Sequence, residues 1–267
     1  MDLFFRKFGE GPPLIILHGL YGSSDNWVSI GRKLSENYKV YILDQRNHGK
    51  SPHTPQHNYK LLKEDLLEFM DKQSIDKAII LGHSMGGKTA MFFAVDYPER
   101  INSLIIVDIS PKSYNDTNSI QLLSHSTIIN SMYKVDLSKV KTREDIDKIL
   151  SQTISSKRVR QFLLKNVNRT KDNRFAWSIN LESISNELEN IMDGLNIESF
   201  KKGAGITGFP VLFIKGEKSD YIETSDKTVI ETIFPFAEIE TIPDAGHWLH
   251  AEQPEIFLKT IQKFLTD

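Results

Sequence analysis

The sequence predicts an α/β protein with a mostly parallel, doubly wound sheet and a helical insertion, on the strength of two observations. Short runs rich in Ile, Val and Leu lack polar alternation, which is typical of strands covered by helices on both faces. Segments with apolar residues at helical spacing lie between these runs. Because strands and helices alternate, a parallel sheet is the simplest arrangement. The apolar runs are residues 14–17, 40–44, 78–81, 104–107 and 211–214.

Three helices and a last strand complete this part of the chain. Residues 62–70 carry apolar side chains at helical spacing, and the helix 88–96 ends before Pro98, since proline cannot continue a helix. The strand 237–242 follows the fifth apolar run. The apolar face of residues 254–265 predicts an amphipathic helix that covers the sheet.

The stretch from 111 to 210 interrupts this alternation. It has no comparable Ile/Val run, and it predicts four helices, at 120–132, 142–154, 157–167 and 182–192. We therefore expect a core formed by residues 1–110 and 211–267, with residues 111–210 as a helical lid. Lys and Arg outnumber Asp and Glu in this insertion. The excess fits either a solvated helix face or a rim that contacts a polyanion.

Composition limits the function classes. The 267 residues include 33 Lys and Arg against 35 Asp and Glu, so the net charge of −2 gives no basic field for nucleic acid or an anionic membrane. The absence of cysteine excludes a disulfide framework, a thiolate metal site and a cysteine nucleophile. No pair of histidines has metal-ligand spacing with a carboxylate, so we expect neither metal nor cofactor. The oligomeric state is left open.

The location of the protein is expected to be cytoplasmic. An acidic residue, Asp2, stands where a signal peptide begins with positive charge, and no long apolar stretch follows it. The apolar runs are far shorter than the roughly 20 residues needed to span a bilayer, so no integral membrane segment is expected.

The loop Gly82-His83-Ser84-Met85-Gly86 follows a predicted strand and precedes a predicted helix. In this context G-x-S-x-G is a nucleophile elbow, in which a sharp turn presents the serine hydroxyl. The helix amino terminus and the Met85 amide are then placed to stabilise an oxyanion. Ser84 is therefore the candidate nucleophile.

The sequence also contains two nucleotide-binding patterns, and the first of them overlaps this loop. Residues 82–89, from Gly82 to Thr89, fit a P-loop, with Asp108 as a magnesium-binding acid. A downstream histidine and a glycine-rich turn after an earlier strand favour the hydrolase interpretation, because a P-loop needs neither. Residues 203–208 match a dinucleotide fingerprint but precede a strand and open no helix, so we interpret them as a hinge.

A serine nucleophile needs a general base, because a hydroxyl reacts poorly until an imidazole takes its proton. His247 is the best placed histidine, since it follows the last predicted strand in a loop that could cross the edge of the sheet. An oxyanion hole also needs a second N–H. Leu20 offers one in the turn Leu17 to Gly22 after the first apolar run.

These segments together resemble a known family. The blocks HGLYGSSDNW, LDQRNHGKSPH, GHSMGGKTAM, VDISP and AGHWLHAEQP resemble the α/β-hydrolase fold superfamily, and most of all the YbfF-type bacterial esterases and ABHD11-like hydrolases. The resemblance implies an α/β-hydrolase fold, with Ser84 as nucleophile and His247 as base. It also implies that the amides of Leu20 and Met85 are the oxyanion donors and that the insertion is a lid over the acyl pocket.

The acid of the triad remains open between two aspartates. It must lie between the serine and the histidine in chain order, at a strand end from which it holds the imidazole tautomer. Asp108 ends the strand after the elbow, and Asp220 follows the strand after the insertion, the more common position in the superfamily. We rank Asp108 first, Asp220 second and Glu182 third.

The predicted function is a serine hydrolase of carboxylic esters or thioesters, acyl-CoA among them, that works through a Ser-His-Asp triad and an acyl-enzyme. The expected partner is a small-molecule ester or thioester. A cofactor-free perhydrolase on the same triad is the first alternative. A P-loop nucleotide hydrolase that uses residues 82–89 is the second.

Overall fold

The computed structural model describes residues 1–201 and 203–266. Seven strands form one sheet in the order β1-β3-β2-β4-β5-β8-β9. The edge strand β1 pairs antiparallel with β3, and the other pairings are parallel. The predicted α/β fold with a mostly parallel sheet is therefore confirmed. The strands are β1 Phe5–Phe8, β2 Pro13–Leu17, β3 Lys39–Leu43, β4 Ala78–His83, β5 Ile101–Val107, β8 Val211–Gly216 and β9 Glu238–Ile242.

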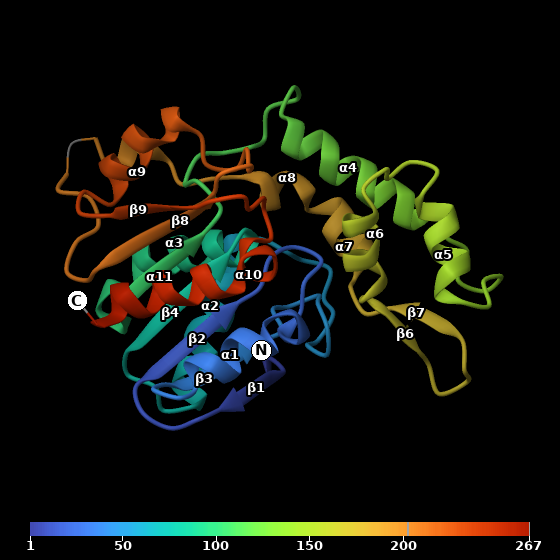
Figure 1. The fold of residues 1–267 in the computed structure, drawn as a ribbon, viewed down its shortest axis with the longest axis horizontal. Coiled ribbons are helices and arrows are strands. Elements are labelled where there is room, and N and C mark those ends of the chain that lie inside the picture. The colour runs from blue at the N-terminus through green and yellow to red at the C-terminus, as the bar shows by residue number, and fades with distance from the viewer. Residues whose placement is uncertain (202, 267) are drawn as a thin grey trace.

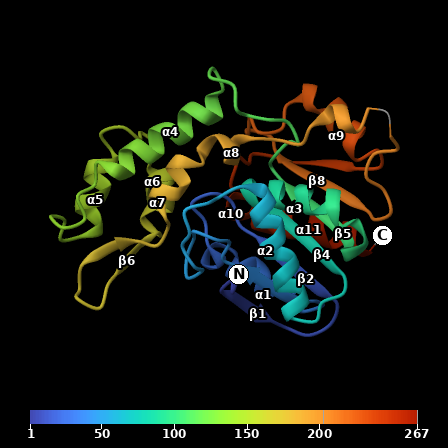
Figure 2. The ribbon, with the colours of Figure 1, turned by 180° about the vertical axis from the view of Figure 1, so that it is seen from behind.

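Helices cover both faces of the sheet, which explains why every residue of β4 is buried. Ile15 and Leu17 of β2 pack in one apolar cluster with α2, α3 and α9, whereas Leu14 and Ile16 pack in a second cluster with α1 and α11. Figure 1 shows α1 and α11 in front of the strands, and Figure 2 shows α2 and α3 on the opposite face. The helices are α1 Val28–Leu34, α2 Tyr59–Lys72, α3 Met85–Asp96, α9 Lys227–Ile233, α10 Leu249–Glu252 and α11 Pro254–Thr266.

The chain leaves the sheet after β5 and returns at β8, and the elements between them project to one side (Figure 1). They are α4 Ile120–Tyr133, α5 Arg143–Leu150, α6 Lys157–Leu164, β6 Val167–Arg169, β7 Phe175–Trp177, α7 Leu181–Asn186 and α8 Leu188–Met192. Short 3-10 turns complete the described elements: η1 Ser24–Trp27, η2 Pro98–Arg100, η3 Ile197–Ser199 and η4 Thr224–Asp226.

The structure of this insertion differs from the sequence prediction in four places. The helix predicted to reach residue 154 ends at Leu150, the one predicted to reach Val167 ends at Leu164, and the helix predicted over 182–192 is two short helices. The hairpin β6–β7 was not predicted. Its strands are three residues long, too short for an alternating pattern to stand out, and its turn contains Asn173 with a positive φ of 59°.

None of the helices within the described residues has both the length and the apolar character needed to cross a membrane.

Candidate active site

Ser84 stands on a strained turn between β4 and α3. Its φ of 52° and ψ of −119° are outside the regions that most residues adopt. A Cβ on Gly82 would lie 2.7 Å from the Cα of Gly87, and a Cβ on Gly86 would lie 2.7 Å from the His18 carbonyl oxygen. Both positions therefore require glycine, because the turn packs directly against backbone. The sharp turn predicted for G-x-S-x-G is present.

Gly86→Ala is expected to destabilise the fold by about 3 kcal/mol or more, since backbone on the other side of the contact cannot yield. Gly203→Ala is a matched control, because the nearest atom to a Cβ there, the Phe200 carbonyl oxygen, is 4.0 Å away. We expect the control to change stability by about 0.5 kcal/mol or less. Denaturant unfolding measures both, and equal effects of the two substitutions would contradict the tight fit of the turn.

Asp108 and His247 lie in direct contact. The Nδ1 atom of His247 is 2.8 Å from Oδ2 of Asp108, which is fully buried at the end of β5. The Ser219 hydroxyl also donates to Oδ2, and the Gly216 amide donates to Oδ1 at 2.9 Å. The carboxylate is thus held by three donors, and its bond to Nδ1 fixes the orientation of the imidazole.

The two other candidate acids lie elsewhere. Asp220 is exposed, and its carbonyl oxygen accepts a bond from Gln121, while no side-chain bond links it to His247 among the described residues. Glu182 is exposed and lines a separate surface cavity that includes His53. Of the three acids considered, the structure brings Asp108 to His247.

Aromatic rings fix His247 from two further directions. The ring of Tyr221 stacks on it with centroids 3.9 Å apart. His83 Nε2 donates to the His247 carbonyl oxygen at 2.8 Å. Burial lowers the pKa of His83 well below its usual value, so this ring is a neutral positioning group.

The loop that carries Leu20 packs against the elbow. A Cβ on the preceding Gly19 would lie 2.8 Å from Nδ1 of His83 and 3.1 Å from Cβ of Ser84. The Tyr21 amide donates to Nε2 of His48 at 3.3 Å. The buried His48 therefore helps to hold the turn that carries Leu20 next to the elbow. Met85 is the first residue of α3. Its backbone N–H therefore has no carbonyl oxygen of the same helix one turn earlier to which it could donate.

Ser84 and His247 line one cavity of about 160 Å³, which we call the central cavity. Its walls come from the Leu20 loop, from the elbow, from α4 and α6, and from the loops that follow β8 and β9. The lining residues are Gly19, Leu20, Tyr21, His83, Ser84, Ser124, His125, Ile128, Val159, Phe162, Leu163, Tyr221, His247 and Trp248.

His125 is a residue of the central cavity that sequence reasoning missed. Its Nε2 lies 3.1 Å from the Tyr221 hydroxyl and its Nδ1 lies 3.4 Å from the Tyr21 hydroxyl. Burial, and secondarily the nearby His247, lowers the pKa of His125 to about 4, so the ring is neutral at pH 7. No local motif marks it, because the packing of α4 on the core brings it to the site.

The P-loop interpretation of residues 82–89 is wrong. Lys88 is buried, and its ammonium donates to the carbonyl oxygens of Pro111, at 3.0 Å, and Lys112. The Thr89 hydroxyl donates to Gln45 Oε1 at 3.0 Å and is also buried. The two side chains that would bind phosphate and magnesium are thus used inside the protein, and Asp108 contacts His247 instead. Residues 203–208 form no helix, as expected for a segment outside a dinucleotide fold.

No group of three or more potential ligands is arranged for a metal ion within residues 1–201 and 203–266.

A mostly parallel seven-stranded sheet, with a serine on the strained turn after β4 and a histidine in the loop after β9, is an arrangement of the α/β-hydrolase fold. A family model described as alpha/beta hydrolase fold matches residues 12–254, and the chain belongs to this family. The family resemblance and the fold class predicted from the sequence are both confirmed.

Named relatives are similar over nearly the whole chain. The sn-1-specific diacylglycerol lipase ABHD11 of Danio rerio is 38% identical, over 99% of this chain and 81% of its own length. Esterase YbfF of Escherichia coli (strain K12) is 33% identical, over 96% of this chain and 93% of its own. A solved structure titled Marine microorganism esterase has 47% identity and a TM-score of 0.94, with 98% of this chain and 99% of that one covered. These similarities support the predicted class of enzyme, a carboxylic ester hydrolase.

Proposed function

We propose that Ser84 is the nucleophile of a serine carboxylic ester hydrolase, with His247 as general base and Asp108 as the acid that orients it. The observation that supports this most is the 2.8 Å contact between Asp108 and Nδ1 of His247, in a cavity that His247 shares with Ser84. Because Nδ1 is bound to the carboxylate, Nε2 is the nitrogen left to accept the serine proton.

In the acylation step, the Ser84 oxygen attacks the substrate carbonyl while its proton moves to His247. The amides of Leu20 and Met85 hold the oxyanion, and each such donor is typically worth about 3 kcal/mol in the barrier. The carbonyl then re-forms, the bond to the alcohol or thiol breaks, and His247 donates its proton to the leaving oxygen or sulfur. The buried Asp108 carboxylate stabilises the imidazolium during this transfer.

In the deacylation step, water takes the place of the leaving group and attacks the acyl carbonyl while its proton moves to His247. The bond between the acyl carbon and the Ser84 oxygen then breaks, the acid is released, and His247 returns the proton to the Ser84 oxygen. A perhydrolase would form the same acyl-enzyme and transfer it to peroxide. Hydrolysis and perhydrolysis would therefore differ only in the second nucleophile.

The insertion is proposed to act as a lid, which makes residues 1–110 and 211–267 the catalytic core and 111–210 the cover. Support comes from α4 and α6, which supply Ile128, Val159 and Leu163 to the wall of the central cavity. An acyl chain would lie against these side chains, so the residues that select the acyl chain belong mainly to the insertion.

Esters and thioesters are both proposed as substrates, with acyl-CoA among the thioesters, because the same acyl-enzyme forms from either. The Danio rerio relative is named for diacylglycerol, which adds neutral lipid esters to the candidates. A cytoplasmic location, a small-molecule partner and the absence of nucleic acid binding stay predictions.

Competition between water and methanol tests the common acyl-enzyme. We expect p-nitrophenyl butanoate and S-butanoyl-N-acetylcysteamine to give the same ratio of methyl butanoate to butanoate, because both pass through butanoyl-Ser84. Product analysis by gas chromatography measures the ratio. A ratio that differs between the two substrates would exclude a shared covalent intermediate. Failure to turn over the thioester would exclude thioesters as substrates of this enzyme.

A further inference from the structure

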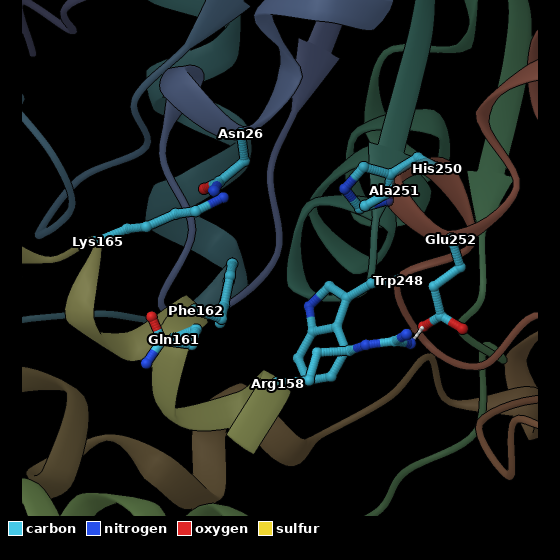
Figure 3. Close-up of a pocket in the computed structure, with 9 residues that line it drawn as sticks. All are labelled: Asn26, Arg158, Gln161, Phe162, Lys165, Trp248, His250, Ala251 and Glu252. Atoms are coloured by element: carbon cyan, nitrogen blue, oxygen red, sulfur yellow. Dashed lines mark ion pairs between the residues drawn. The ribbon is translucent and has the colours of Figure 1, made fainter. Parts of the chain in front are cut away.

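Two further cavities share walls with the central cavity. Ser124, Ile128 and Val159 line both the central cavity and a cavity of about 410 Å³, which we call the apolar arm. Phe162 and Trp248 line both the central cavity and a cavity of about 240 Å³, which we call the basic arm (Figure 3). The site therefore has room on two sides.

The chemistry of the two arms differs. The apolar arm has no ionisable side chain in its lining, which consists of Ile120, Leu123, Ser124, Thr127, Ile128, Thr153, Ile154, Ser155, Ser156 and Val159. The basic arm combines two cations and several hydrogen-bonding groups with aromatic side chains. It is lined by Asn26, Arg158, Gln161, Phe162, Lys165, Trp248, His250, Ala251 and Glu252.

Lys165 gives the basic arm a net positive charge. Arg158 and Glu252 form an ion pair at 2.7 Å, and Glu252 also accepts from the Gly246 amide at 2.9 Å, so these two charges offset each other. Lys165 forms no ion pair among the described residues. A single uncompensated ammonium beside a partly enclosed cavity favours an anion there.

His250 supplies a second observation that points to a ligand. It is 6% exposed, and its ring stacks on Trp27 at 4.1 Å. Its Nδ1 is fully buried without a partner in the described part of the chain, so a ligand in the cavity cannot reach that atom. Its Nε2 is not among the fully buried atoms and also has no hydrogen-bond partner among the described residues, so this nitrogen is left to meet a ligand. Figure 3 shows the ring turned toward the cavity, on the side opposite Lys165 and Asn26. Burial lowers the pKa of His250 to about 3, so the imidazole is neutral and can donate.

Asn26 adds a donor from the core. Its Oδ1 accepts from the Ser23 amide at 2.8 Å, which leaves the side-chain NH₂ for the cavity that it lines. Lys165 directly follows α6, Asn26 is in η1 and His250 is in α10, so three separate parts of the chain bring nitrogen atoms to one space.

The basic arm lies on the side of the leaving group. His247 donates a proton to the leaving atom in the proposed mechanism, so that atom must be next to the imidazole. Trp248 directly follows His247 in the chain, His250 is three residues after it, and both line the basic arm. The uncharged apolar arm suits the acyl chain, which leaves the charged arm for the other half of the substrate.

We propose that the basic arm binds an anionic oxygen group, a phosphate or carboxylate, on the leaving group of the substrate. Lys165 pairs with the anion, Asn26 and His250 hydrogen-bond to it, and Phe162 and Trp248 cover the apolar part of the leaving group. The subsite rests on the proposed function, since it assumes the direction in which His247 releases the leaving atom.

The test compares two thioesters with the same acyl chain. S-butanoyl coenzyme A has a leaving group with phosphates, and S-butanoyl-N-acetylcysteamine has a neutral one. We expect wild type to favour the coenzyme A thioester at low salt, less so as salt rises. Lys165→Gln should lower kcat/KM for the coenzyme A thioester about tenfold, mainly through KM, and leave the neutral thioester unchanged.

Two controls make the result specific. Lys171→Gln replaces an exposed lysine of the same insertion outside the basic arm and should leave the preference intact. The second control uses p-nitrophenyl hemiglutarate and p-nitrophenyl butanoate, which differ in charge on the acyl side. Lys165→Gln should change kcat/KM by the same factor for both esters.

Three outcomes would overturn the subsite: equal kcat/KM for the two thioesters in wild type, an equal loss in Lys171→Gln, or a loss in Lys165→Gln specific to the hemiglutarate. Failure of the proposed function is distinguishable, because it would appear as no turnover of the neutral substrates by wild type and would overturn the subsite with it.

Discussion

Ser84→Ala is expected to lower kcat for p-nitrophenyl butanoate by about 10⁴-fold or more, because it removes the atom that forms the acyl-enzyme. Steady-state kinetics with a sensitive chromogenic ester measure the loss. KM should change little, since the walls of the central cavity remain. A loss below about tenfold would contradict the role of Ser84 as nucleophile.

The double variant Ser84→Ala/His247→Ala gives the matching control. Groups that act as one unit have non-additive effects, so the double variant should be about as slow as Ser84→Ala alone. If the two losses multiplied instead, Ser84 and His247 would be acting independently, and the proposed proton transfer between them would be wrong.

Asp108→Asn is expected to lower kcat by about 10⁴-fold, because an amide can present its NH₂ to Nδ1 of His247 and stabilise the wrong tautomer. Asp220→Asn, in an exposed loop, should stay within about threefold of wild type. Comparing kcat of the two variants on one ester tests the assignment. Near-normal activity of Asp108→Asn together with a large loss in Asp220→Asn would contradict it.

The core was predictable because its signals are local. Apolar runs mark β2, β4, β5 and β8, and a serine between glycines marks the turn after β4. Each of these features depends on residues close together in the chain. The same applies to His247, which follows the last strand.

The choice of acid was not predictable from local pattern. Asp108 and His247 are 139 residues apart, and their contact depends on β8 pairing with β5 after a long insertion. That pairing brings the Gly216 amide and the Ser219 hydroxyl to the Asp108 carboxylate, whereas the neighbouring Asp220 is exposed. Both aspartates follow strands, so the sequence alone could only rank them.

The insertion was the hardest part to predict. The strands β6 and β7 are short, and His125 reaches the central cavity only because α4 packs over the core. The burial of the histidines after β3 was also not predictable from the sequence. His48 and His57 lie in a loop without helix or strand, yet both are fully buried. Long-range packing, and not loop composition, decides their environment.

Covalent labelling by a fluorophosphonate, followed by peptide mass spectrometry, tests the assigned nucleophile most directly. We expect one phosphonyl group per chain, located on the peptide that contains Ser84, with labelling strongly slowed in His247→Ala. Rapid labelling at another residue, or an active enzyme that the reagent leaves unmodified and uninhibited, would contradict the assignment of Ser84.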